Sequence, residues 1–224
     1  MFSAFDRTDS WVFDLDNTLY PASANLFALM DVRMGQYISD LTGVDPAEAR
    51  RVQKRYFVEH GTTLAGLMAH HCVDPHSYLD FVHDVELDRI KADPDLAQAI
   101  RALPGRKLVF TNADATYSSR VIAKRGLSDC FEAVFDIHDA TYLPKPDGRA
   151  YDAFLAAHNV DPTRATMFED MARNLRPAKE RGMATVWINN GSEHGKAEAC
   201  PSFIDAETHD LGHFLAQLTG ATIP

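Results

Sequence analysis

Two carboxylates stand two residues apart in the stretch WVFDLDNTLYP, which begins at Trp11. Asp14 and Asp16 follow an apolar run that is typical of a buried strand. In an extended backbone, side chains at i and i+2 point to the same side, so the two acids are expected to lie close together. Close carboxylates repel each other, and one pKa rises unless a cation offsets the charge. The pair therefore predicts a metal site or an acid–base site.

A hard divalent cation suits this pair. Mg²⁺ takes a few carboxylate ligands, keeps several waters and receives its remaining ligands from substrate phosphate. Asp170 follows a distant apolar run and is the expected further ligand. We therefore predict Mg²⁺ as the cofactor.

The same residues are suited to phosphoryl transfer. A carboxylate beside a metal can attack phosphorus and form an aspartyl-phosphate. The second carboxylate can protonate the leaving alcohol and later deprotonate the attacking water. The Thr111 hydroxyl and the Asn112 amide are suited to hold phosphoryl oxygens, and Lys145 in LPKPDG supplies a positive charge.

The elements that position these residues can be predicted from short runs rich in β-branched and aromatic residues. The predicted strands are 11–14, 107–112, 132–137, 166–170 and 185–189. From the second run onward, helical patterns separate the strands, over 115–125, 147–158 and 171–181. Pro177 predicts a kink or break in the last of these helices. A final strand at 203–204 and a helix near 210–218 are expected to close the core.

Strand–helix alternation predicts an α/β fold with a Rossmann-like parallel sheet. Ligands bind beyond the carboxyl ends of the strands in such sheets. The polar residues that follow three of the predicted strands are Asp14, Asp16, Thr111, Asn112, Glu169 and Asp170. We expect them to converge on one edge of the sheet.

The segment between the first two strands reads as helices throughout. An apolar stripe recurs at helical spacing from Leu26 to Leu41. Asp-Pro pairs at 45, 74 and 93 are typical of helix starts. This is too much helix for a simple crossover, so we predict an α/β core of residues 1–20 and 104–224 and an inserted all-helical cap of residues 21–103.

The composition excludes several classes of function. With 22 Lys and Arg against 32 Asp and Glu, the formal charge is −10, which disfavours binding to a nucleic acid polymer. No apolar run approaches the roughly 20 residues that cross a bilayer, and the first ten residues do not resemble a secretory signal. The three cysteines are odd in number and far apart, at Cys72, Cys130 and Cys200, which predicts reduced thiols. We expect a cytoplasmic protein without a membrane partner, as a monomer or homodimer.

Four motifs together resemble those of the haloacid dehalogenase superfamily of phosphohydrolases. They are DLDNTL (14–19), FTNAD (110–114), Lys145 with Pro146, and FEDMARN (168–174). The helical insertion between the first two motifs resembles the helical-cap (C1-type) subclass. Such caps close over small phosphorylated metabolites and exclude water.

The resemblance implies a role for each matching residue. Asp14 resembles the nucleophile and Asp16 the general acid/base. Thr111 resembles the phosphate-binding hydroxyl, and Lys145 resembles the lysine that steadies nucleophile and phosphate. Asn112 is a further candidate for contact with the phosphate or the nucleophile.

The resemblance also implies a ligand set for Mg²⁺. Asp14, the main-chain carbonyl of Asp16, and Asp170 resemble the ligands, and Glu169 is expected to add one directly or through water. The final acidic position of the fourth motif is occupied by Asn174, which weakens the prediction of a ligand there.

The residues flanking the motifs, in FDLDNTLYP, FTNAD and FEDMARNL, most resemble the pyrimidine 5′-nucleotidase group. This implies hydrolysis of UMP or CMP. Asp16 argues against the dehalogenase reaction, which needs no acid to protonate an alkoxide leaving group. One alternative is a phosphatase or phosphomutase acting on another small metabolite such as a sugar phosphate. Another is a non-catalytic binding protein with the same fold.

The predicted cap contains a group of histidines, at His70, His71, His76 and His83. Their spacing fits no zinc template, so we interpret most of them as helix-surface residues. The segment FVHDVELD (81–88) is a better candidate for substrate specificity. Met30 and Met34 are predicted to belong to the core rather than to the substrate pocket.

Overall fold

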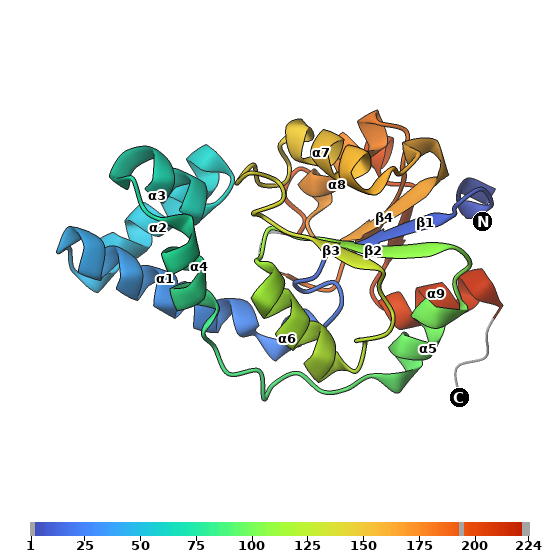
Figure 1. The fold of residues 1–224 in the computed structure, drawn as a ribbon, viewed down its shortest axis with the longest axis horizontal. Helices are drawn as coiled ribbons and strands as arrows, with labels where there is room; N and C mark the ends of the chain where they lie inside the picture. Colours follow the sequence, from blue (N-terminus) through green and yellow to red (C-terminus); the bar gives the residue numbers. More distant parts are fainter. Residues whose placement is uncertain (1–2, 193–194, 221–224) are drawn as a thin grey trace.

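The computed structural model describes residues 3–192 and 195–220 (Figure 1). Within these residues, a parallel sheet has its strands in the order β3-β2-β1-β4-β5-β6. The strands are β1 Ser10–Phe13, β2 Arg106–Phe110, β3 Ala133–Phe135, β4 Ala165–Glu169, β5 Ala184–Ile188 and β6 Ala206–Thr208. The predicted α/β class with a parallel sheet is confirmed.

Helices cover both faces of the sheet, as Figure 1 shows. One face carries α7 Gly148–His158 and α8 Ala172–Glu180, and the other carries α5 Pro94–Ala102, α6 Ala115–Arg125 and α9 Leu211–Thr219. This explains the apolar run in β1. Trp11 and Phe13 pack into the hydrophobic cluster on the side of α5, α6 and α9, and Val12 packs into the cluster with α7 and α8.

The segment between β1 and β2 forms a group of helices beside the sheet, at the left of Figure 1. These helices are α1 Leu26–Thr42, α2 Pro46–His60, α3 Thr63–His71 and α4 Pro75–His83. The Asp-Pro prediction is confirmed, because Asp45, Asp74 and Asp93 cap α2, α4 and α5, each with Pro at the first helical position. The bounds 21–103 stay a prediction. Because α5 packs on α9 of the core, we propose that the cap ends before Pro94.

The predicted strand at 203–204 is wrong, and so is the break predicted as one of two outcomes at Pro177. The segment Pro201–Phe203 forms a 3₁₀ turn, and the last strand begins at Ala206 instead. Pro201 has no amide to pair with a sheet, and the backbone amide of Asp205 bonds the Thr185 carbonyl just before β6 begins. In addition, α8 is not broken at Pro177, because its packing against β4 and β5 offsets one missing helical hydrogen bond.

None of the helices in the described ranges combines the length and the hydrophobicity that a membrane-spanning helix needs.

Candidate active site

The strand register brings the predicted residues together. Phe13 of β1 pairs with Val109 of β2 on one side and with Phe168 of β4 on the other. The chain therefore leaves these three strands side by side. The amide of Asp14 continues the pairing by donating to the Phe168 carbonyl at 2.9 Å. The expected convergence of polar residues at the carboxyl edge is confirmed for these strands.

Lys145 lies at the centre of this edge and is 1% exposed. Its Nζ donates to Asp14 Oδ1 at 2.8 Å, to Glu169 Oε2 at 2.7 Å and to the Phe110 carbonyl at 2.8 Å. Burial by itself lowers the pKa of Lys145, but the carboxylates of Asp14 and Glu169 together raise it above its ordinary value. Lys145 is thus a fixed cation that touches the predicted nucleophile.

Three buried carboxylates form one cluster beside Lys145. Asp14, Glu169 and Asp170 each have an oxygen within 4.8 Å of the others. Burial, followed by the charge of Asp14, raises the pKa of Glu169 to about 7. Burial, followed by the charges of Glu169 and Asp14, raises the pKa of Asp170 well above its usual range. One lysine does not offset three carboxylates, so the cluster fits a hard divalent cation with oxygen ligands.

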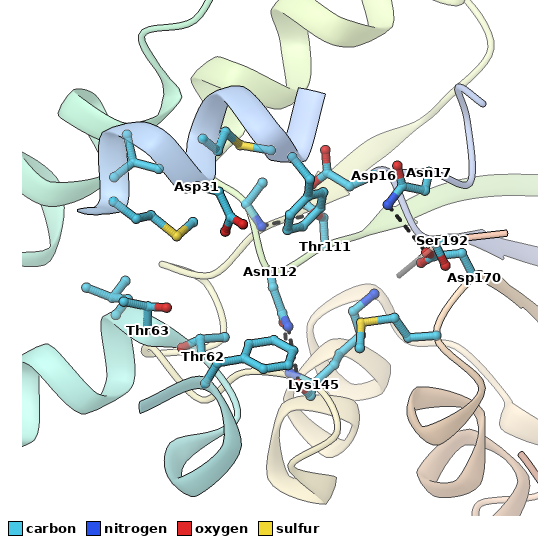
Figure 2. Close-up of a pocket in the computed structure, with 18 of the residues that line it drawn as sticks. Asp16, Asn17, Asp31, Thr62, Thr63, Thr111, Asn112, Lys145, Asp170 and Ser192 are labelled. Atoms are coloured by element: carbon cyan, nitrogen blue, oxygen red, sulfur yellow. Dashed lines mark hydrogen bonds between the residues drawn. The ribbon is translucent and has the colours of Figure 1, made fainter. Parts of the chain in front are cut away.

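Other side chains lie close to Asp170. Asn17 Nδ2 is 3.5 Å from Asp170 Oδ2, and Ser192 lies next to both in Figure 2. Asn174, which replaces an acidic residue of the fourth motif, also lines the site, and its Oδ1 has no hydrogen-bond partner among the described residues.

Asp16 stands apart from the three-carboxylate cluster. Its Oδ1 accepts hydrogen bonds from Tyr20 at 2.6 Å and from Tyr117 at 2.9 Å. Burial and the charge of Asp14 raise the pKa of Asp16, although both tyrosine hydroxyls oppose the shift. A carboxyl group with a raised pKa is suited to general acid catalysis near neutral pH.

Sequence reasoning missed both tyrosines. Tyr20 lies within the quoted motif, four residues after Asp16, so its position offered a signal. Tyr117 lies on α6, 101 residues from Asp16, and its place in the site depends on how α6 packs on the sheet, where it contacts β3.

We expect Tyr117→Phe to lower kcat by about 10- to 100-fold, because a hydrogen bond to a charged group contributes about 1.5–3 kcal/mol. Tyr20→Phe should have a comparable effect, since its hydroxyl bonds the same oxygen. Steady-state kinetics of both variants test this. The control is Tyr142→Phe, because the Tyr142 hydroxyl bonds His138 and His76 rather than Asp16 and the residue does not line the cavity. Unchanged kcat in both site variants would contradict a positioning role.

Thr111 and Asn112 follow β2. Thr111 is buried, and its Oγ1 accepts from the Ala113 amide at 3.0 Å, which leaves the hydroxyl proton free for a ligand oxygen. Both ends of the Asn112 side chain bind the main chain of Lys145: Oδ1 accepts from its amide at 2.8 Å and Nδ2 donates to its carbonyl at 3.2 Å (Figure 2). We therefore propose that Asn112 positions Lys145, with one amide proton left for a phosphate oxygen.

A cavity of about 510 Å³ lies between this edge and the cap, within the range of about 300–1,000 Å³ that is usual for small-molecule sites. Residues of the sheet edge and residues of the cap helices both line it. Met30 and Met34 do so as well as packing in the core, so the prediction that they lie outside the pocket is wrong. Both lie on α1, which packs in the cap and also borders the cavity. Within the segment 81–88, Val82 and His83 line the cavity.

The expectation that most of these histidines lie on the surface is confirmed, because His70, His71 and His76 are exposed; His83 is the exception and is buried. It projects from the end of α4 toward the core, where its Nδ1 pairs with Asp114 Oδ2 and its ring stacks on Tyr117 with centroids 4.5 Å apart. The contact with His83 lowers the pKa of Asp114 in spite of burial, which acts in the opposite direction. His83, at the end of α4, therefore contacts Tyr117, whose hydroxyl donates a hydrogen bond to Asp16.

One family fits this sequence and geometry. The sequence model described as haloacid dehalogenase-like hydrolase matches residues 9–182, which include all four motifs. The chain belongs to this hydrolase family. Its place in the superfamily, predicted from the motifs, is confirmed.

Two curated relatives of this haloacid dehalogenase-like hydrolase have names that refer to phosphate chemistry. Phosphate metabolism protein 8 of Saccharomyces cerevisiae is 28% identical over 190 residues, which are 78% of this chain and 59% of that protein. Phosphoglycolate phosphatase of Caulobacter vibrioides is 29% identical over 192 residues, which are 80% of this chain and 78% of that protein.

Solved structures show the same fold. The HAD phosphatase from Thermococcus onnurineus has a TM-score of 0.64 at 20% identity, over 96% of this chain and all of that one. L-2-haloacid dehalogenase from Xanthobacter autotrophicus has a TM-score of 0.60 at 18% identity, with the same coverage. The HAD hydrolase YfnB from Bacillus subtilis, whose structure is bound to magnesium, has a TM-score of 0.60 at 14% identity, over 96% and 99% of the two chains.

Proposed function

We propose that this haloacid dehalogenase-like hydrolase is a Mg²⁺-dependent phosphomonoesterase with a helical cap of the C1 type, acting on pyrimidine nucleoside 5′-monophosphates. The phosphatase reaction is supported mainly by the different surroundings of Asp14 and Asp16. Asp14 lies against Lys145 and the three-carboxylate cluster, and Asp16 is held apart by two tyrosine hydroxyls. This arrangement supplies a nucleophile and a separate proton donor.

The chemistry follows from these contacts. Asp14 attacks phosphorus and forms an aspartyl-phosphate, while Asp16 gives its proton to the leaving oxygen. Lys145 and the Thr111 hydroxyl offset the charge on the phosphoryl oxygens. Asp16, now ionised, then takes a proton from the water that attacks the intermediate. The cap excludes bulk water from the ester during the first step.

Asp14, Asp170 and the Asp16 carbonyl would hold the Mg²⁺ ion, with Glu169 as a further ligand directly or through water. When bound, the ion offsets negative charge on the carboxylates and on the phosphate. The raised pKa values of Glu169 and Asp170 support this assignment, because a bound cation would offset the repulsion between these buried carboxylates.

We expect Mg²⁺ to stabilise the folded protein, because an ion that binds only the folded state adds about 2.7 kcal/mol at a hundred times its Kd. Thermal unfolding with increasing Mg²⁺ measures the effect. In Asp170→Asn the stabilisation should largely disappear, since the variant lacks one of the clustered carboxylates. An equal shift of Tm in Asp170→Asn and in the wild type would place the ion elsewhere.

The substrate assignment has two supports: the residues flanking the motifs, and a cavity that extends from the carboxylates into the cap. The test is phosphate release from UMP, CMP, AMP, GMP, phosphoglycolate and several sugar phosphates, each with Mg²⁺ and with EDTA. Metal-dependent release that favours UMP or CMP is the expected result. Preference for phosphoglycolate or a sugar phosphate would agree with the proposed mechanism but contradict the proposed nucleotide substrate.

Two alternatives are distinguished by product analysis. A phosphomutase would return an isomeric phosphate ester with little free phosphate, because it shields the same intermediate from water. A binding protein without activity would release no phosphate from any substrate. Cytoplasmic location and a monomeric or dimeric state stay predictions.

A further inference from the structure

Two buried polar atoms of cap residues that line the cavity have no hydrogen-bond partner among the described residues. They are Gln53 Oε1 on α2 and the Tyr78 hydroxyl on α4. Each residue is 2% exposed, and both line the cavity. A buried polar atom without a partner costs about 1–3 kcal/mol, so a ligand that brings a partner recovers this free energy on binding. The proposed mechanism uses neither atom.

The orientation of the Gln53 amide is determined by its neighbours. Its Nε2 donates to Asp31 Oδ1 at 2.6 Å and lies 3.4 Å from Met34 Sδ. The reversed amide would place Oε1 against the Asp31 carboxylate, and two acceptors repel each other. The unpartnered atom of Gln53 is therefore the acceptor, and its missing partner is an N–H or O–H group.

The charge of Asp31 is offset by the cap itself. Arg50 contacts its carboxylate at 3.0 Å and Lys54 at 3.5 Å. Figure 2 shows Asp31 projecting from α1 into the space that Thr111 and Asn112 border from the core. Asp31 thus orients Gln53 without making this part of the cavity strongly negative.

The second buried atom without a partner is the Tyr78 hydroxyl. Burial, the neighbouring Tyr37 and the Asp31 carboxylate all raise the pKa of Tyr78, so its proton stays in place as a hydrogen-bond donor. A ligand that satisfies both atoms must present a hydrogen-bond donor to Gln53 Oε1 and an acceptor to the Tyr78 hydroxyl.

We propose that Gln53 and Tyr78, oriented by Asp31, form the subsite for the leaving group and bind the N–H edge of a pyrimidine base. In uracil, N3–H donates to Gln53 Oε1 and the adjacent carbonyl accepts from Tyr78. In cytosine, the amino group and N3 take the same two roles. This subsite rests on the proposed function. It would explain why a pyrimidine nucleotide is the preferred substrate.

The same chemistry disfavours a carboxylate-bearing leaving group such as glycolate. A carboxylate has no donor for Gln53 Oε1 and would place negative charge against a fixed acceptor. It therefore leaves the buried oxygen unpaired and adds repulsion.

The test compares uridine with 3-methyluridine, in which a methyl group replaces the N3 proton and the charge is unchanged. Calorimetry measures the binding of both nucleosides to the metal-free wild-type protein, so this readout does not depend on catalysis. We expect 3-methyluridine to bind about 10- to 100-fold more weakly. The same ratio should appear in kcat/KM for UMP and its N3-methyl derivative.

Substitutions test whether Gln53 and Tyr78 cause the difference in affinity between uridine and 3-methyluridine. Gln53→Met keeps the size of the side chain and removes the acceptor, so the ratio should fall toward one. Tyr78→Phe removes one hydroxyl and should weaken uridine binding by about tenfold. Gln36→Met is the matched control, because Gln36 is exposed on α1, pairs with Asp40 and does not line the cavity. It should keep the wild-type ratio.

The outcomes separate the subsite from the proposed reaction. Equal binding of uridine and 3-methyluridine, no binding of uridine, or a ratio that Gln53→Met leaves unchanged would overturn the subsite. Discrimination between the nucleosides without phosphate release from UMP would support the subsite and overturn the reaction.

Discussion

Asp14→Asn is expected to lower phosphate release by a factor on the order of 10⁴ or more, because an amide cannot replace the attacking carboxylate. The variant keeps the size of the side chain. The oxygen that Lys145 contacts at 2.8 Å can be replaced by the amide oxygen, so folding should be retained. Phosphate release and circular dichroism measure the two quantities.

A second measurement identifies the attacking atom. Wild-type protein quenched in acid during turnover should carry one added phosphoryl group on the peptide that contains Asp14, and the variant should carry none. Asp152→Asn is the matched control, since Asp152 pairs with Arg181 on the exposed side of α7 and such surface pairs contribute about 0–1 kcal/mol. Activity of Asp14→Asn within tenfold of wild type would show that water attacks phosphorus directly.

Lys145→Met should remove activity and also destabilise the protein by about 3–5 kcal/mol, because it leaves two buried carboxylates without their cation. Lys145 Nζ contacts Asp14 and Glu169 at 2.8 and 2.7 Å, and all three side chains are buried. For a chain of this size the expected fall in Tm is about 10 °C. Denaturant unfolding in EDTA measures the change without a contribution from metal.

A double variant tests the electrostatic cause. In Lys145→Met with Glu169→Gln, one of the two carboxylates is neutral, so at least about 1 kcal/mol should return. Lys124→Met is the control, because its pair with Asp88 is exposed and should contribute less than about 1 kcal/mol. Equal losses in the Lys145 and Lys124 variants would show that the buried lysine does not offset the carboxylates.

The sequence by itself determined the features that local patterns encode. The strand-end acids Asp14 and Asp170, the alternation of strands and helices, and the Asp-Pro helix starts follow from periodicity and capping chemistry over a few residues. The order of the motifs indicated the family. These predictions succeeded because each depends on neighbours in the chain, and a parallel sheet then brings its strand ends together.

The tertiary structure decided which side chains meet across long separations. Tyr117 reaches Asp16 from 101 residues away, and Asn112 holds the main chain of Lys145 from 33 residues away. The pairing of Gln53 with Asp31 depends on how α2 packs against α1. No local pattern distinguishes these polar residues from others on a helix or loop. Their partners are selected by burial, where a polar group without a hydrogen bond is costly, and burial depends on the whole fold.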